Sequence, residues 1–502
     1  MLFNSYTFIV FFAIMLALHN LPLSWKTKKV NLLLASYIFY AAWNPPFILL
    51  LWLSTVIDYF VGRALYNQKD GYQRKLLLVI SLVGNLGMLC FFKYGGFLLE
   101  NFVAVVNALG IDYQPAAPNI ILPAGISFYT FTTLCYTIDM YKRKSEPVKS
   151  LLDFSLFVTF FPHLVAGPIV RPPQLVPQFE TPRTASQQQL LNGLFLLSLG
   201  LFMKVVLADG MLAGSADLVF NAATALPTLD AWMGVLAFSG QIFFDFAGYS
   251  TCAIGIASCL GFTLPENFRY PYAAIGFSDF WRRWHITLST WLRDYLYIPL
   301  GGNRHGEFRT YTALMLTMLL GGLWHGASWT FVVWGALHGI YLCVERLFRP
   351  KPLTPDQIIL EAISNKEEAV EPPVITASAS FAPAFLRNKG ATNFFAALFT
   401  FFLVNVTWVF FRASDFPTAG RLLSSMFGNI NGGVPVLTTL AILKVSVITV
   451  LLVLTHWFMR NTSVLQVAHK LKWWLVGIIW AFMLILLLLS QESSSSFIYF
   501  QF

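Results

Sequence analysis

The sequence predicts an all-α protein that crosses a membrane many times. The chain has 502 residues, of which 57% are hydrophobic and 11% are charged, and its mean hydropathy is +0.64. Soluble domains carry about 25% charged residues, so this composition excludes an ordinary soluble domain. Apolar runs of about 20 residues, each long enough to cross a bilayer as a helix, recur along the chain. These runs are continuous rather than alternating in hydrophobicity, which excludes an outer-membrane barrel.

The positions of the lysines and arginines predict the orientation of the N-terminal helices. Basic residues cluster at 26–29, 63–75 and 142–149, whereas the loop at 100–119 carries no Lys or Arg. Cytoplasmic loops are enriched in Lys and Arg, so we place the three clusters in the cytoplasm and the N-terminus in the periplasm. The first apolar segment lacks a basic start and a small-residue cleavage site, and is predicted to be a retained helix. Residues 1–150 are therefore expected to form N-terminal transmembrane helices.

The rest of the chain is predicted to divide into three parts. In residues 151–346, which we expect to form the core, the apolar pattern is interrupted by Pro162, Pro168, Pro172, Pro173 and Pro177. Re-entrant segments explain this interruption, because irregular backbone is tolerated at membrane depth only inside protein or along a cavity. Residues 347–390 are polar and are predicted to form a partly disordered cytoplasmic loop. Residues 391–502 are expected to form C-terminal transmembrane helices that end with aromatic residues at the periplasmic interface.

The most informative stretch is 280–304, FWRRWHITLSTWLRDYLYIPLGGNR, because it is basic and aromatic within a very apolar chain. Charge at membrane depth is costly unless it is paired or lines a water-filled path. The charged and histidine side chains of this stretch are therefore candidate site residues: Arg282, Arg283, His285, Arg293, Asp294 and Arg304. The arginines suit the phosphates of a donor such as coenzyme A. They suit anionic lipid headgroups equally well.

Asp245 and His285 each have two interpretations. Asp245 lies in apolar sequence and is a candidate site residue, or it pairs structurally with one of the nearby arginines. His285 is either a second polar group near the cytoplasmic mouth of a tunnel, or an interfacial residue in a belt of Arg and Trp side chains. The residues alone do not decide between these interpretations.

His325 is the strongest candidate for chemistry. It lies about midway between Arg309 and Arg346, which we place in the cytoplasm, so the chain is expected to enter the membrane and return with His325 deep inside. Residues 321–326, GGLWHG, contain glycines that permit close backbone approach and an opened helix. Histidine suits proton transfer near neutral pH, and Trp324 is a candidate contact for substrate or donor. The alternative is a core histidine that donates a hydrogen bond to a carbonyl.

Several other classes of site are excluded or unsupported. The net charge of +9 is explained by cytoplasmic lysines and arginines, so no nucleic-acid partner is expected. The five cysteines lie in apolar segments without the spacing of metal ligands, and no metal site is expected. The sequence has no Walker loop, no GxSxG nucleophile elbow and no HExxH zinc helix. We therefore expect no bound cofactor.

Five motifs, in this order, closely resemble those of the membrane-bound O-acyltransferase family. Besides the stretch 280–304, they are FPHLVAGPI at 161–169, FDFAGYS at 244–250, LPENF at 264–268 and WHG at 324–326. The resemblance covers nearly the whole chain. Its nearest branch is the bacterial one that includes alginate O-acetyltransferase, and the D-alanyl transferase of teichoic acid synthesis is more distant. Thr251 stands where the alginate branch usually carries Asp, so other exopolysaccharides and peptidoglycan stay open as acceptors.

The resemblance implies a helical core around a central tunnel, with His325 as the catalytic histidine and His285 as the second histidine of the family pair. It implies an acetyl group taken from a cytoplasmic thioester, either acetyl-coenzyme A or an acyl carrier, and moved across a bacterial inner membrane. The expected partners are the lipid bilayer, a periplasmic acetyltransferase of SGNH type and the polysaccharide export machinery. Two alternatives of other classes are a transporter of acyl groups or lipid-linked sugars, and a scaffold in an export complex.

Overall fold

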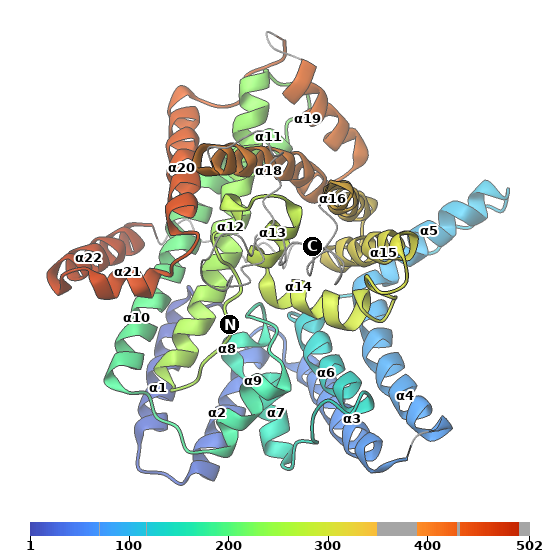
Figure 1. Ribbon diagram of the computed structural model, residues 1–502, viewed down its shortest axis with the longest axis vertical. Helices are drawn as coiled ribbons and strands as arrows, with labels where there is room; N and C mark the ends of the chain where they lie inside the picture. Colours follow the sequence, from blue (N-terminus) through green and yellow to red (C-terminus); the bar gives the residue numbers. More distant parts are fainter. Residues whose placement is uncertain (70, 117, 349–388, 429–431, 491–502) are drawn as a thin grey trace, which may run out of the picture.

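The computed structural model describes residues 1–69, 71–116, 118–348, 389–428 and 432–490. These residues form helices and loops without a strand, which confirms the predicted all-α class (Figure 1). Within them, six helical segments are long and apolar enough to cross a membrane, and two shorter apolar helices, Tyr6–Asn20 and Trp473–Leu489, accompany them. The six are Pro45–Asn67, Tyr72–Ala108, Gln187–Phe220, Thr228–Cys259, Gly390–Arg412 and Thr439–Met459. The protein is therefore a polytopic membrane protein.

A buried polar cluster joins three of the N-terminal helices. The N-terminal helices are α1 (Tyr6–Asn20), α2 (Trp25–Ala41), α3 (Ile48–Asn67), α4 (Tyr72–Leu89), α5 (Gly95–Ala108) and α6 (Ile126–Tyr141). The Asp58 carboxylate on α3 accepts hydrogen bonds from Asn85 Nδ2 at 2.7 Å, from Thr137 Oγ1 at 3.0 Å and from the Ser81 hydroxyl. Buried polar groups need such partners, and these partners come from α4 and α6. The cluster thus joins three helices.

A π-helical turn, η2 (Cys90–Tyr94), separates α4 from α5. Figure 1 shows the two helices running in different directions on either side of it. The two helices and this turn together form the segment Tyr72–Ala108. Single π-helical turns inside α-helices are rare and are frequent at functional sites. This turn carries Lys93 and Tyr94, which reach the helix that ends at His325.

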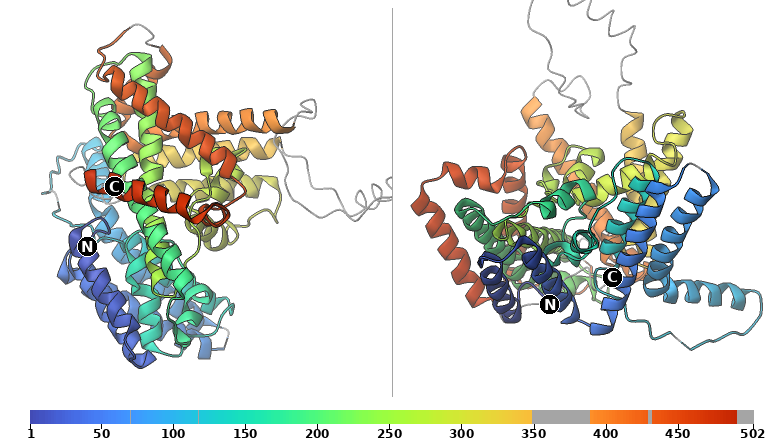
Figure 2. Two further views of the ribbon diagram at one scale, coloured as in Figure 1. Left: turned by 90° about the vertical axis from the view of Figure 1, so that its left-hand side faces the viewer. Right: turned by 90° about the horizontal axis from the view of Figure 1, so that it is seen from below.

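Two long helical segments form the centre of the molecule, where the sequence pattern leaves the number of membrane crossings open. The first is α10 (Gln187–Leu201), continued by η3 (Phe202–Ala213) and α11 (Gly214–Phe220), and it packs along α12 (Thr228–Cys259). The helix α12 runs through the middle of the molecule (Figures 1 and 2). Glycines permit the close contact, since a Cβ on Gly200 would lie 2.5 Å from the Gly248 carbonyl oxygen.

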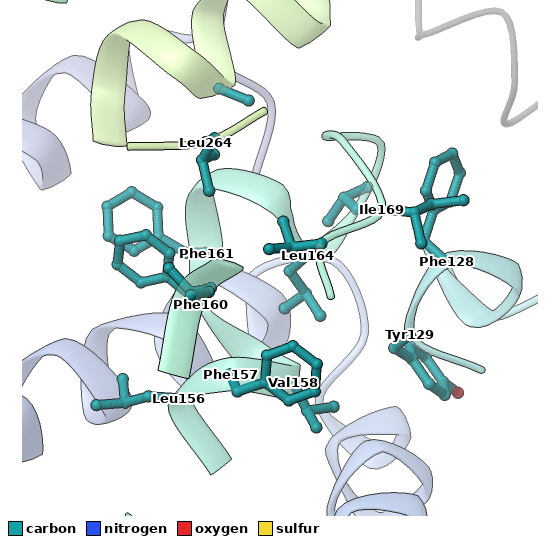
Figure 3. Close-up of a cluster of buried hydrophobic side chains, with 14 of the residues drawn as sticks. Phe128, Tyr129, Leu156, Phe157, Val158, Phe160, Phe161, Leu164, Ile169 and Leu264 are labelled. Carbon is teal, nitrogen blue, oxygen red and sulfur yellow. The ribbon is translucent and has the colours of Figure 1, made fainter. Parts of the chain in front are cut away.

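The proline-rich segment folds into short buried helices. They are α7 (Leu151–Thr159), α8 (Phe161–Leu164) and α9 (Pro172–Glu180). Phe157, Phe160 and Phe161 are fully buried, and Figure 3 shows them in one cluster with Leu164 and Leu264. The irregular backbone that the prolines predict therefore lies inside the protein, where its polar groups can be satisfied.

The predicted histidine hairpin is present as α15 (Glu307–His325) and α16 (Trp329–Leu347). The two helices touch at glycines, as predicted: a Cβ on Gly322 would lie 2.3 Å from the Phe331 carbonyl oxygen. The prediction of an opened helix is wrong, because α15 stays helical up to its last residue, His325. The glycines serve contact with α16, and side chains from η2 hydrogen-bond the final carbonyls of the helix.

The remaining helices flank this hairpin along the chain. Before it come α13 (Phe277–Arg283), α14 (Ile286–Leu292) and η5 (Arg293–Tyr297). After it come α18 (Lys389–Arg412), α19 (Phe416–Gly428), α20 (Thr439–Met459), α21 (Val464–Lys470) and α22 (Trp473–Leu489). The predicted cytoplasmic loop lies almost wholly outside the described residues, and so does the aromatic C-terminus.

Candidate active site

The two predicted histidines both lie beside one indole ring. The ring of Trp324 has its centroid 4.9 Å from that of His325 and 6.1 Å from that of His285. His285 is fully buried, and His325 is 2% exposed. The structure therefore brings together three of the residues that the sequence predicts for the site. They come from two elements, because His325 and Trp324 end α15 whereas His285 immediately precedes α14.

His285 is held in one tautomer by Asn267. Its Nδ1 lies 3.1 Å from Asn267 Oδ1, which also accepts hydrogen bonds from the backbone N–H of Thr287 at 3.2 Å and its hydroxyl at 2.8 Å. Since that oxygen is an acceptor, Nδ1 carries the proton and Nε2 keeps its lone pair. Among the described residues, Nε2 has no hydrogen-bond partner. The backbone of His285 is left-handed, with φ 43° and ψ 56°, and such outliers cluster at functional sites.

Asn267 is a site residue that reasoning from residue chemistry did not find. It is 1% exposed, and its Nδ2 donates a hydrogen bond to Ser250 Oγ at 3.1 Å. Because Ser250 belongs to α12, Asn267 connects the central helix to His285. The available signal was the position of Asn267 in the LPENF motif. A buried amide in that motif, with every polar atom bonded, fixes the orientation of the imidazole.

Two side chains from η2 bind the end of the helix that carries His325. Lys93 Nζ donates a hydrogen bond to the His325 carbonyl oxygen, and the Tyr94 hydroxyl donates one to the Leu323 carbonyl oxygen, both at 3.0 Å. The last carbonyls of a helix lack partners within the helix, and a cation beside them is favourable. The Lys93 ammonium also lies 5.8 Å from the centroid of the Trp324 ring. Reasoning from the sequence missed both residues, because 232 positions separate Lys93 from His325.

Two cavities approach the histidines. One, of about 130 Å³, is lined by Trp324, His325, Lys93 and residues 122–128, together with Trp43 and Val165. The other, of about 610 Å³ and mostly apolar, reaches Asn267, the partner of His285. His285 lines neither of them. A central tunnel would have to connect these two cavities by passing His285 and Trp324. The two are separate cavities in this structure, so the tunnel stays a prediction.

Asp245 pairs with Lys204, so the prediction that its partner is an arginine is wrong. Lys204 lies on η3, and the packing of η3 along α12 brings its ammonium to the carboxylate. Lys204 Nζ also lies 3.0 Å from Asp209 Oδ1. All three side chains are less than a tenth exposed. Asp245 therefore belongs to a buried ion cluster between the central helices.

Replacing Lys204 with methionine is expected to destabilise the protein strongly. Removing one partner of a buried ion pair leaves a desolvated charge and costs about 3–5 kcal/mol. Thermal unfolding of the detergent-solubilised protein measures the effect. Lys204→Arg keeps the charge and is expected to lose much less stability than Lys204→Met. Equal unfolding temperatures for wild type and Lys204→Met would contradict the importance of this cluster.

The arginines of α13 contact polar groups of their own helix. Arg282 is exposed, and its Nε donates to the Ser278 carbonyl oxygen at 3.1 Å. Arg283 Nε lies 3.0 Å from Asp279 Oδ1. Neither arginine has a contact with His285 or His325 among the described residues. The structure thus leaves open a role for these arginines in binding an anionic donor at the protein surface, and does not bring them to the histidines.

Arg293 and Asp294 form a second surface group. The Arg293 guanidinium lies 2.7 Å from the Asp294 carboxylate, and Arg171 approaches the same carboxylate at 2.7 Å. Burial alone raises the pKa of Asp294, but the hydrogen bonds from Arg293 and Arg171 outweigh it and lower that pKa below its usual range. Asp294 therefore stays ionised at neutral pH and fixes α9 against η5. Arg304 is exposed and lies outside this group.

The sequence motifs and the geometry of the histidines agree with comparisons to known proteins. A model of the MBOAT, membrane-bound O-acyltransferase, family matches residues 143–352, a range that contains both histidines and Trp324. A protein from Azotobacter vinelandii named "Probable alginate O-acetylase AlgI" is 40% identical over 436 residues, which cover 85% of this chain and 78% of the relative. The chain belongs to the membrane-bound O-acyltransferase family.

Other relatives in this family are named for different polymers. The peptidoglycan O-acetyltransferase of Helicobacter pylori is 39% identical over 430 residues, which cover 80% of this chain and 74% of the relative. The teichoic acid D-alanyltransferase of Streptococcus thermophilus is 31% identical over 283 residues, which cover 51% of this chain and 66% of the relative. This membrane-bound O-acyltransferase is therefore an enzyme, and the names of its relatives leave several acceptors open.

Proposed function

We propose that this membrane-bound O-acyltransferase moves an acetyl group from a thioester to a carbohydrate hydroxyl, with His325 as the general base. The position of His325 carries the proposal: it ends the first helix of the hairpin and lines a cavity of about 130 Å³. Drug-sized ligands occupy pockets of roughly 300–1,000 Å³, so this cavity suits an acetyl group better than a long acyl chain. Two of the relatives that cover most of the chain are named O-acetylase and O-acetyltransferase.

The chemistry requires one base and a dry site. The acceptor oxygen attacks the thioester carbonyl carbon while His325 takes the hydroxyl proton. The tetrahedral intermediate then collapses, the C–S bond breaks, and the departing thiolate takes the proton from His325. The rings of Trp334 and Phe411 have their centroids 5.0 and 5.4 Å from that of His325. Together with Trp324 they exclude water, which limits hydrolysis of the thioester.

We assign His285 a supporting role on the donor side. Its Nδ1–H is bound by Asn267, so Nε2 can accept a hydrogen bond from a thiol or a water. The ring of Trp324 lies beside His285, and Asn267 lines the large apolar cavity. His285 thus suits a position on a proton path or beside the donor, rather than the attack on the carbonyl.

The basic clusters set the proposed direction of transfer. With these clusters assigned to the cytoplasm, the proposed donor, acetyl-coenzyme A or an acyl carrier thioester, acts from the cytoplasm of a bacterium, and both ends of the chain face the periplasm. The acceptor side then faces the periplasm, where an SGNH-type acetyltransferase and the export machinery are the expected partners. The acceptor polymer is alginate or another exported polysaccharide. Peptidoglycan is the second candidate, favoured by the name of the Helicobacter pylori relative.

Reconstitution in liposomes tests this function. Purified protein receives radiolabelled acetyl-coenzyme A and either alginate oligosaccharides or peptidoglycan fragments, and protein-free liposomes serve as the control. We expect the label to leave coenzyme A and to appear in an ester on one of the acceptors. A transporter would instead deliver the label across the membrane without breaking the thioester. The proposed function would be contradicted if acetyl-coenzyme A stayed intact with both acceptors, and if an acetylated carrier protein, used as donor in its place, also stayed intact.

A further inference from the structure

We infer that Lys93 is a further catalytic residue, whose ammonium binds the oxyanion that forms on the acyl carbonyl oxygen. This inference rests on the proposed function, since it requires a thioester carbonyl beside His325. Lys93 lies outside residues 143–352, the range that matches the family model, and outside every motif in the sequence that resembles the family. It comes to the site through the fold alone.

The position of Lys93 suits an oxyanion ligand. It lies on η2 and lines the same cavity of about 130 Å³ as Trp324 and His325. Its Nζ donates one hydrogen bond, at 3.0 Å, to the backbone carbonyl oxygen of His325. A lysine ammonium has three N–H donors, so two others can reach an oxygen in the cavity. The bond to the carbonyl fixes the ammonium beside the residue proposed to act as the base.

The charge of Lys93 is not neutralised by an acidic side chain. Its contacts among the described residues are the His325 carbonyl and the Trp324 ring, and neither is a carboxylate. It is also the one charged side chain among the described residues that line this cavity. Lys93 lies in Tyr72–Ala108, which is long and apolar enough to cross a membrane, and a cation at membrane depth is costly and by default marks a function. In a small site lined mostly by apolar groups, such a cation attracts an oxygen that is gaining negative charge.

The electron flow of the reaction gives Lys93 its role. When the acceptor oxygen bonds to the carbonyl carbon, the π electrons of the C=O bond move to its oxygen, which becomes O⁻. The Lys93 ammonium donates a hydrogen bond to that O⁻, while His325 holds the proton from the hydroxyl. When the C=O bond re-forms, the C–S bond breaks and the thiolate receives the proton. Lys93 ends the cycle unchanged, and no further reactant is needed.

The size of the cavity favours the acyl carbonyl oxygen over a carboxylate of the acceptor. A cavity of about 130 Å³ is well below the roughly 300–1,000 Å³ of sites for drug-sized ligands. Its size suits an acetyl group better than a sugar ring with its carboxylate. The ligand of Lys93 is therefore the carbonyl oxygen of the transferred group.

The experiment compares three variants of the reconstituted full-length protein. Lys93→Met removes the charge and the donors while keeping a long side chain. Lys93→Arg keeps both the charge and the donors. Tyr94→Phe is the matched control, because it removes the neighbouring hydrogen bond to the end of α15 and Tyr94 does not line the cavity. If Lys93→Met does not fold, Lys93→Gln removes the charge and retains N–H donors on a somewhat shorter side chain.

Two readouts separate catalysis from support of the helix. The first is kcat and KM for donor and acceptor: Lys93→Met is expected to lower kcat about 10²–10³-fold, the usual effect of losing one oxyanion donor, with both KM values near wild type. Lys93→Arg is expected to recover at least part of this loss, and Tyr94→Phe to lose less than about fivefold in kcat.

The second readout is the infrared stretching frequency of the carbonyl group in a ¹³C-labelled acetyl thioester bound without acceptor. A hydrogen bond from Lys93 lowers this frequency in wild type and Tyr94→Phe, and the lowering is lost in Lys93→Met.

The outcomes also separate this inference from the proposed role of His325. Equal losses of kcat in Lys93→Met and Tyr94→Phe, with an unchanged carbonyl frequency, would overturn the inference. An increase in acceptor KM alone would assign Lys93 to the acceptor carboxylate and overturn it as well. If His325→Ala keeps full activity while Lys93→Met has a low kcat and a shifted carbonyl frequency, the role of His325 as base is refuted. The role of Lys93 as the oxyanion ligand is then still supported. The reverse pattern would refute Lys93 and support His325.

Discussion

Replacing His325 with alanine is expected to lower the kcat of acyl transfer about 10²–10⁴-fold, the contribution of a general base. The imidazole lines the small cavity and packs against the rings of Trp324, Trp334 and Phe411, which places it where it can take the proton. The assay follows label transfer from the acetyl thioester in liposomes. KM for the donor is expected to change little, because the base acts in the transition state rather than in binding.

The control for this substitution is a second buried histidine of the same hairpin. His338 on α16 is fully buried, and its Nε2 lies 3.0 Å from Thr407 Oγ1, so it packs and bonds within the protein. His338→Ala should therefore lower the unfolding temperature about as much as His325→Ala and keep the kcat of the folded protein. Wild-type turnover by His325→Ala, or equal losses of kcat in the two variants, would refute a chemical role for His325.

The sequence predicts the fold class and the hairpin because both depend on local pattern. Long apolar runs determine which segments are helices, and glycines at 321 and 322 predict close contact with a neighbouring helix. The contact is real, since Gly322 lies against the Phe331 carbonyl oxygen. The number of crossings in residues 151–309 was not predictable. In this region the long helices α10 and α12 alternate with short helices. Such irregular backbone is stable at membrane depth only because the surrounding protein buries it, and the local sequence pattern does not show that burial.

The site is predictable only where a residue type is unusual for its surroundings. His325 and His285 stand out as histidines in apolar sequence, and the structure places them near each other. Asn267, the partner of His285, does not stand out, because an asparagine has many possible roles in a membrane protein. Lys93 is a cation in an apolar segment, but 232 positions separate it from His325, so the sequence does not show that the two residues meet. The pairing of Asp245 with Lys204 also could not be predicted from the sequence. Helix packing, rather than closeness in the sequence, decides which cation lies beside a buried carboxylate.

Replacing Gly322 with alanine is expected to damage both stability and activity, since the added Cβ would lie 2.3 Å from a backbone oxygen of α16. A backbone atom cannot rotate away as a side chain can, so the two helices of the hairpin must move apart. Overpacking of this kind costs about 1–3 kcal/mol. Because α15 ends at His325, the shift also displaces the imidazole, and a displacement of about 1 Å can cost roughly 10²-fold in kcat. Thermal unfolding and label transfer measure the two effects.

The neighbouring glycine provides the matched control that separates helix contact from helix propensity. A Cβ on Gly321 would lie 3.3 Å from Leu292 Cδ1, the end of a flexible side chain that can move by a few tenths of an ångström. Gly321→Ala is therefore expected to keep nearly wild-type stability and kcat, while Gly322→Ala loses both. Alanine is the better helix former by about 1 kcal/mol, so the propensity gain is the same at both positions and cannot explain a difference. Equal behaviour of the two variants would show that the contact between α15 and α16 does not position His325.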